Sequence, residues 1–200
     1  MKRISGIGSS FFFLLLIIPA CKPEIPVPKP RAYPKVNYPK KQAQDFKQDF
    51  CEFSFKYPQY TQIIQDTDFF GEAPVHPCWF DIYYPDFNSR IHCSYIPITP
   101  EKDFEKLKSD AFELADWHNK KANYIEEMQV SKGNVQGFIF DIEGPVASPF
   151  QFFLTDSANT HFFRGSLYFN NQVNPDSLAP IYEFIKEDII ELINTFEWHP

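Results

Sequence analysis

The sequence predicts an α+β fold in which a mostly antiparallel sheet is flanked by two long helices. Aromatic residues make up 18% of the chain, with 23 Phe and 10 Tyr. Such side chains favour strands because they fit a pleated, half-buried surface. The segments that alternate between apolar and polar residues are joined by short links, which favours antiparallel pairing. Two other stretches repeat apolar residues at helical spacing, which indicates the helices.

Residues 1–20 have the pattern of a lipoprotein signal peptide. Two cations precede an apolar run over residues 11–18, and Pro19 and Ala20 come directly before Cys21. The run is shorter than the roughly 20 residues that a permanent membrane-spanning helix needs. Cys21 is therefore the expected lipidation site, with an ordinary secretory signal as the alternative. Two acyl chains suffice for stable attachment, so we expect a lipid bilayer as partner and a periplasm-facing location in the cell envelope.

Residues 21–41 are expected to form a Pro-rich, basic tether behind the lipidated cysteine. Six prolines favour extended chain, at about 3.1 Å per residue, so this stretch is a spacer. Residues 22–41 carry six basic residues and one acidic residue, whereas residues 42–200 carry 11 basic and 25 acidic residues. The basic stretch either lies on anionic headgroups or cell-wall polymer, or is a soluble linker. The acidic remainder argues against nucleic acid as a partner.

Residues 42–200 have the size of a single globular domain with its own core. Alternating aromatic residues predict a first strand at residues 53–57. Residues 79–84 and 90–96 predict a hairpin around a turn-rich PDFNS segment. Thr99 and Pro100 then begin a helix, and its apolar stripe is expected to continue from Phe104 through Leu114 and His118 to Ile125.

The second half of the chain predicts three more strands and a closing helix. Segments 135–142, 150–155 and 161–169 are joined by short, turn-rich links, which indicates a three-stranded meander. Asn174, with Pro175 behind it, opens the last helix, whose apolar residues recur as far as Phe196. Helices that flank a meander, rather than alternate with single strands, point to an α+β sandwich.

Three cysteines remain in the mature chain once Cys21 carries lipid. They are Cys51, Cys78 and Cys93, and in an oxidising compartment this odd number predicts one disulfide and one free thiol. Cys78 and Cys93 straddle the predicted hairpin turn and could bridge across it. The spacing leaves the pairing open.

Several segments also carry a family resemblance. They are the lipoprotein cysteine with its Pro-rich lead, CEFSFKYP at 51–58, PCW at 77–79, PDFN and RIH within 85–92, ASPFQFFLTDS at 147–157, and HFFRGSLYFN at 161–170. Together they resemble the GldD family of gliding motility lipoproteins over essentially the whole mature chain. The resemblance implies a lipid-anchored accessory of surface gliding and of the associated type IX secretion machinery. It also implies other envelope proteins as partners, with no catalytic activity and no cofactor.

The resemblance bears on the disulfide and, more loosely, on the fold. Cys51 and Cys78 both fall in matching segments, so it favours the Cys51–Cys78 pairing. Closing that loop would contribute on the order of 3 kcal/mol. Tyr57-Pro58 and the closing segment 195–198 are similar to the Mog1 and PsbP fold, which is an analogy of fold and not of function.

A hydrolase is the sharpest enzymatic alternative. Asp156, Ser157 and His161 would supply the triad, with His92, His118 and Arg164 as further partners. However, the chain has no G-x-S-x-G elbow, and an Asp-Ser pair is what a turn between two strands needs for local hydrogen bonds. His118 is expected to pack on the apolar stripe of its helix. The chain also has no H-E-x-x-H or C-x-x-C motif, so we expect no metal site and no enzyme.

Three residues are expected to make structural or partner contacts. Strand alternation places Arg164 among aromatic side chains on one face of its strand and His161 on the other. We expect Arg164 to form a buried ion pair with one of the many acids, or to stack on a ring. Trp79, within the family-like PCW segment, is the third.

Two classes of function remain. The first is a non-enzymatic machine component that docks against other envelope proteins through exposed aromatic residues, the residue type that dominates binding hot spots. The second is an independent envelope module that binds glycan or cell-wall fragments on aromatic side chains.

Overall fold

A computed structural model describes residues 35–67, 73–99, 103–170 and 175–199 of the chain. These residues belong to one compact unit. The predicted signal peptide, Cys21 and most of the tether lie outside the described residues. Within the described part of the chain, no helix is long and apolar enough to cross a membrane.

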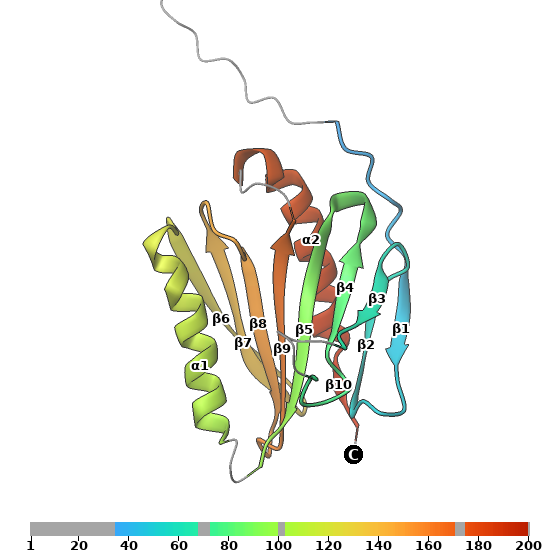
Figure 1. The fold of residues 1–200 in the computed structure, drawn as a ribbon, viewed down its shortest axis with the longest axis vertical. Coiled ribbons are helices and arrows are strands. Elements are labelled where there is room, and N and C mark those ends of the chain that lie inside the picture. The colour runs from blue at the N-terminus through green and yellow to red at the C-terminus, as the bar shows by residue number, and fades with distance from the viewer. Residues whose placement is uncertain (1–34, 68–72, 100–102, 171–174, 200) are drawn as a thin grey trace, which may run out of the picture. The chain divides into compact units, whose positions relative to one another are not determined.

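Seven strands form one antiparallel sheet, in the order β3-β4-β5-β9-β8-β7-β6 (Figure 1). They are β3 (Gln62–Gln65), β4 (Phe80–Tyr84), β5 (Ser89–Pro97), β6 (Tyr124–Lys132), β7 (Val135–Glu143), β8 (Phe150–Asp156) and β9 (His161–Phe169). The predicted hairpin is confirmed by β4 and β5, which pair around the short helix η1 (Pro85–Phe87). The predicted meander is confirmed by β7, β8 and β9.

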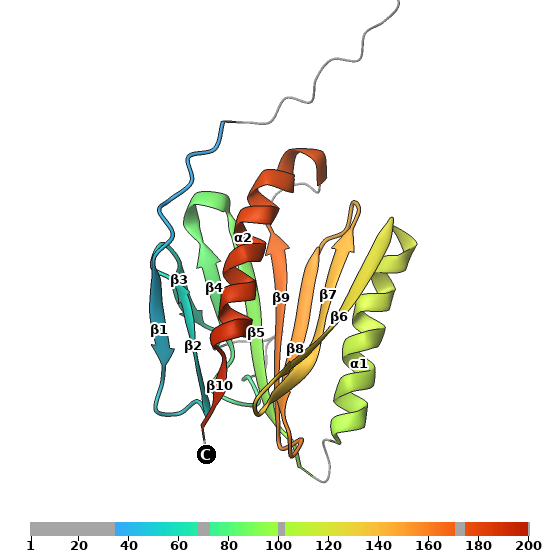
Figure 2. The same ribbon diagram turned by 180° about the vertical axis from the view of Figure 1, so that it is seen from behind.

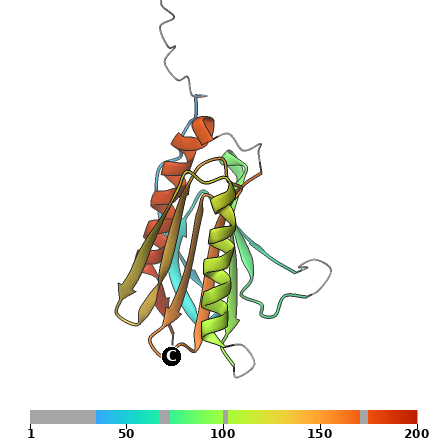
Figure 3. The same ribbon diagram turned by 90° about the vertical axis from the view of Figure 1, so that its left-hand side faces the viewer.

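A smaller sheet and a helix cover one face of the seven-stranded sheet. The smaller sheet has the order β1-β2-β10, with β1 (Ala43–Lys47), β2 (Phe53–Pro58) and β10 (Glu197–Trp198). Helix α2 (Pro175–Thr195) lies beside it on the same face (Figure 2). Helix α1 (Phe104–Asp116), followed by η2 (Trp117–Lys120), lies on the opposite face (Figure 3). The fold is thus the α+β sandwich that the sequence predicts.

The aromatic content of the sequence is explained by the core beneath α2 and the smaller sheet. Phe53 of β2 is fully buried, and its ring centre lies 4.8 Å from that of Phe163 and 5.3 Å from that of Phe196. Gly165 of β9 makes room for this packing, because a Cβ there would lie 2.3 Å from the ring of Phe152. The buried side chains of α2 in this core are Ile185, Ile189, Leu192 and Ile193.

A second, smaller cluster lies beneath α1. Ala111 and Ala115 are buried against Phe140, Phe153 and Phe162 of the sheet. Their small side chains let the helix approach the aromatic surface closely. Asp103, and not the predicted Thr99, begins this helix, since its carboxylate accepts a hydrogen bond from the backbone N–H of Glu105.

The prediction that the apolar stripe of this helix continues to Ile125 is wrong. The helix stops at Asp116, Leu114 is 43% exposed, and Ile125 belongs to strand β6. Strand β6 is the last strand of the sheet and carries charged residues on both faces, so its apolar alternation is weak. The strands β1 and β3 were not predicted for a similar reason, since they are short and neither has a clear apolar alternation.

The folded unit also begins before the predicted boundary at residue 42. Val36 packs against the core, and the ring of Tyr38 lies 4.8 Å from that of Phe184 in α2. The Lys41 ammonium lies 2.6 Å from Glu187 and 3.1 Å from Asp188. The last residues of the predicted tether are therefore seated on α2.

Candidate functional site

The residues proposed for a catalytic triad are engaged in a turn. Asp156 ends β8 with only 4% of its surface exposed, and its carboxylate accepts hydrogen bonds from the backbone N–H groups of Ala158, Thr160 and His161. The Ser157 hydroxyl donates to the side-chain oxygen of Asn134 in the neighbouring turn. Neither side chain is bonded to the His161 ring. The sequence-based hydrolase alternative therefore finds no support in this geometry.

Asp156 provides a prediction about stability. Desolvation would raise its pKa, but the hydrogen bonds from His161, Thr160 and Ala158 outweigh it and hold the pKa below its ordinary value. Asp156→Asn should lower the free energy of unfolding by about 1–3 kcal/mol at pH 7. Because the folded pKa is depressed, this contribution is present above about pH 4 and is lost as the pH falls through the folded pKa.

Thermal unfolding at pH 7 and at pH 3 measures this difference. The difference in unfolding temperature between the wild type and Asp156→Asn should be smaller at pH 3 than at pH 7. Ser157→Ala, at the exposed neighbour, is the matched control and should change stability little at either pH. An equal difference in unfolding temperature at the two pH values would contradict a stabilising role of the ionised Asp156 carboxylate.

His161 belongs to a half-buried network at the end of β5 and the start of β9. The Tyr95 hydroxyl donates to a Glu52 carboxylate oxygen at 3.1 Å and lies 2.7 Å from His161 Nδ1. The same nitrogen lies 3.1 Å from that oxygen, and the ring of Trp198 stacks on the imidazole with centres 5.1 Å apart. The network joins the β1–β2 loop, the large sheet and β10.

Trp79 and His76 lie beside the same tyrosine. The Trp79 indole N–H donates to the backbone oxygen of Tyr95 at 2.8 Å, and the His76 ring lies edge-on to the Tyr95 ring. Burial lowers the pKa of His76, whose Nδ1 accepts a hydrogen bond from the Cys78 N–H. Three segments far apart in the sequence thus meet around Tyr95.

The structure joins Cys51 to Cys78, with Cα atoms 5.8 Å apart. This is the pairing that the family resemblance favours. Cys93 is a free, buried thiol on β5, so the alternative bridge across the β4–β5 hairpin is not formed.

Arg164 lies apart from this network, and the prediction that it pairs with an acid is wrong. Its guanidinium donates to the amide oxygen of Gln151 at 2.9 Å, and no carboxylate of the described residues lies within ion-pair distance. The neutral side-chain amide of Gln151, on the neighbouring strand β8, is the partner in place of an acid. His118 lies in η2, where burial and the charge of Arg164 lower its pKa. His92 is bound to Asp81 at 2.9 Å.

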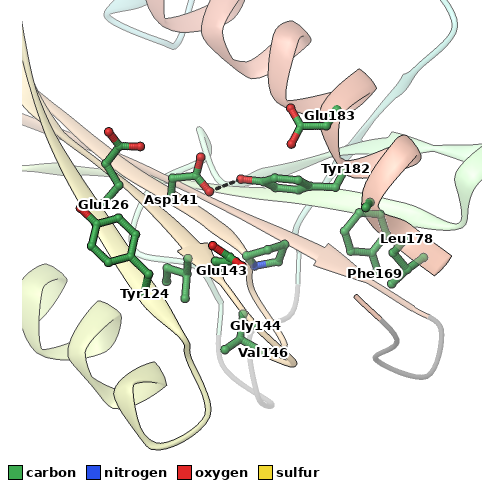
Figure 4. A pocket seen from close by; sticks show the side chains of 13 residues that line it. Tyr124, Glu126, Asp141, Glu143, Gly144, Val146, Phe169, Leu178, Tyr182 and Glu183 are labelled. Atoms are coloured by element: carbon green, nitrogen blue, oxygen red, sulfur yellow. Dashed lines mark hydrogen bonds between the residues drawn. The ribbon is translucent and has the colours of Figure 1, made fainter. Parts of the chain in front are cut away.

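Sequence reasoning missed a cleft of about 310 Å³ between the edge of the large sheet and the first turns of α2 (Figure 4). Its floor is apolar and comes from the end of β7, the β7–β8 connection, the end of β9 and α2. The floor residues include Ile142, Val146, Pro149, Phe169 and Leu178. Tyr124, at the start of β6, is 62% exposed at the margin. The cleft has a size that suits a small ligand or a few side chains.

The cleft is acidic, and one of its four carboxylates is neutralised. Tyr182 donates a hydrogen bond to Asp141 (Figure 4), and the ammonium of Lys186 forms an ion pair with the same carboxylate. Desolvation and the bond to Asp141 raise the pKa of Tyr182, so its hydroxyl stays protonated and donates. The other three acids that line the cleft, Glu126, Glu143 and Glu183, are exposed.

Only part of this site had a signal in the sequence. Glu183, Glu187 and Glu191 recur every four residues, which places them on one side of the last helix. Tyr124 and Glu126 were assigned to a helix tail, so nothing brought them to α2. The described residues hold no group of three or more His, Cys, Asp or Glu that could bind a metal ion.

These features define an α+β sandwich protein with an acidic, apolar-floored cleft beside the terminal strand of its larger sheet. The family model for the gliding motility lipoprotein GldD matches residues 23–198, and the chain belongs to this family of gliding motility lipoproteins.

No curated protein matches the chain. Among solved structures, the chain is similar to the solution structure of cyanobacterial PsbP (CyanoP) from Synechocystis sp. PCC 6803, with 10% sequence identity and a TM-score of 0.47. That similarity covers 80% of this chain and 95% of the cyanobacterial one.

Proposed function

We propose that the protein is a lipid-anchored, non-enzymatic component required for gliding motility and for the associated type IX protein secretion machinery. The observation that carries this proposal is the family match over residues 23–198. Cys21 holds the protein to a membrane, and the folded unit faces the periplasm at the end of its basic tether. From there it docks against other envelope proteins.

The geometry supports docking rather than catalysis. Asp156 and Ser157 are occupied by turn hydrogen bonds, and His161 is bonded to Tyr95 and Glu52. The acidic cleft, in contrast, presents three exposed carboxylates over an apolar floor. Such a surface can bind a partner through charge and apolar contact.

Deletion of the gene tests the proposal with two readouts, colony spreading and export of a secretion reporter. We expect both to be lost and both to be restored by the intact gene. Ser157→Ala should restore them equally well, because the serine is a turn residue. Normal spreading and export in the deletion strain would contradict the proposal and favour an independent module that binds glycan or cell-wall fragments. Failure of Ser157→Ala alone, with the protein folded and present, would instead indicate catalysis.

A further inference from the structure

The cleft forms a groove between the first turns of α2 and β6, at the open edge of the large sheet. Strand β6 is the terminal strand, and β7 is its one strand partner among the described residues, so one row of β6 backbone groups faces outward. A second hollow, of about 450 Å³, adjoins the cleft at Glu183 and follows α2 past Glu187 and Ile190. An unpaired edge of nine residues beside a groove is suited to receive an extended chain.

This groove is strongly acidic. Glu126, Glu143 and Glu183 line it, and Glu187 and Glu191 line the adjoining hollow on α2, where Glu187 is paired with Lys41. Lys186 is the one cation among the lining residues, and its charge is taken up by Asp141. Between the carboxylates lies apolar surface, including Phe169 and Leu178. The surface therefore complements a side chain that has an apolar stem and a cationic head, which is the chemistry of lysine and arginine.

The chain itself shows how α2 receives an extended basic segment. On the other flank of the helix, residues 35–41 have no regular secondary structure, and Lys41 binds Glu187 and Asp188. Its ammonium also lies 4.4 Å from the centre of the Phe184 ring. The carboxylates and ring thus hold one lysine on the side of α2 where the tether runs. The β6 side presents similar groups, with Tyr124 and Tyr182 as the rings.

We propose that the groove between β6 and α2 binds an extended segment of a partner protein that carries lysine or arginine. The segment lies along the β6 edge, its stems cover the apolar floor, and its cations pair with Glu126 and Glu183. The inference rests on the proposed docking function and gives the partner a chemistry. The chain's own tether is a weaker occupant, because its described end is seated on the other flank, with Tyr38 against Phe87 and Phe184.

A peptide-binding measurement on the full lipidated protein tests this inference. The protein is placed in nanodiscs of zwitterionic phosphatidylcholine, so that a basic peptide gains nothing from anionic lipid. The probe is a fluorescent 12-residue peptide of alternating Lys and Val, read by anisotropy, with a Glu–Val peptide and empty nanodiscs as references. We expect binding of the Lys–Val peptide alone. The double variant Glu126→Gln/Glu183→Gln should raise Kd about tenfold, since two charge-assisted contacts lose their charge.

Glu127→Gln is the matched control. It removes the same charge one residue away, on the face of β6 that points away from α2, and should leave Kd unchanged. Near-ultraviolet circular dichroism checks that each variant is folded. Equal binding of the Lys–Val and Glu–Val peptides, no binding at all, or an equal loss in Glu127→Gln would each overturn the proposal.

The tether is tested as the competing occupant in the same assay. A variant with Lys29, Arg31 and Lys35 replaced by serine should bind the probe as the wild type does. Binding that occurs only in this variant would assign the groove to the tether and overturn the partner proposal. Since binding is measured on purified protein, its failure can be distinguished from a failure of the spreading and export assays.

Discussion

Phe53→Ala should lower the free energy of unfolding by about 3–5 kcal/mol, a cost typical of removing a large aromatic side chain from a core. Phe53 is fully buried in β2, between the smaller sheet and the larger one. Its ring contacts six other aromatic rings, those of Phe46, Phe55, Tyr95, Phe163, Phe196 and Trp198. Neighbours that are themselves rigid rings cannot easily collapse into the space, so most of the cavity should persist.

Equilibrium unfolding in urea, followed by circular dichroism, measures this loss. Phe50→Ala is the control, because Phe50 is 48% exposed in the loop before β2 and should cost little. A loss below about 1 kcal/mol for Phe53→Ala would mean that the two sheets do not share the aromatic core described above.

Removal of the Cys51–Cys78 disulfide should have the next largest effect on stability. The bridge closes a loop with a sequence separation of 27 residues, and its loss should cost about 3–4 kcal/mol through the greater freedom of the unfolded chain. The double variant Cys51→Ala/Cys78→Ala removes the bridge without leaving a free thiol in its place. Its unfolding midpoint should therefore fall well below that of the wild type.

Cys93→Ala separates loss of the bridge from loss of a buried cysteine. It keeps the disulfide and removes one small buried side chain, so it should be much less destabilising than the double variant. Mass spectrometry of unreduced peptides should recover Cys51 and Cys78 in one linked pair. A Cys78–Cys93 link, or a double variant as stable as the wild type, would contradict the account.

The parts of the fold that the sequence predicted are those with strong local patterns. The β4–β5 hairpin has a polar turn between two alternating aromatic segments, and the β7–β9 meander has three aromatic-rich strands with short links. The helix α2 combines a proline near its start with regular apolar spacing. In each case the local preference and the tertiary packing agree, so the pattern is sufficient.

The parts that were missed depend on tertiary position. Strand β6 is an edge strand that contains Glu126 and Glu127, and its alternation becomes clear only once β7 is known to pair with it. The cleft then combines residues from β6, β7, β9 and α2, which no local pattern brings together. The partner of Arg164 was missed as well, because the position of Gln151 beside it depends on the register of β8 against β9.

The network around Tyr95 was also beyond local reasoning, although its members were individually noticed. His161, Trp79 and Cys78 stand out in the sequence as polar, aromatic or covalent features. Tyr95, the neighbour of His161 and Trp79, looks in the sequence like one more aromatic residue of an alternating strand. Only the pairing of β5 with β9 places it opposite Phe163 and close to His161.

The most direct test of the central claim is complementation of the deletion strain with Cys21→Ala, compared with the intact gene at matched protein levels. The account predicts that only the intact, lipidated protein restores colony spreading and export of the secretion reporter, because docking requires the folded unit to be held at the membrane. Full restoration of both activities by a stable, unlipidated Cys21→Ala protein would contradict an anchored role.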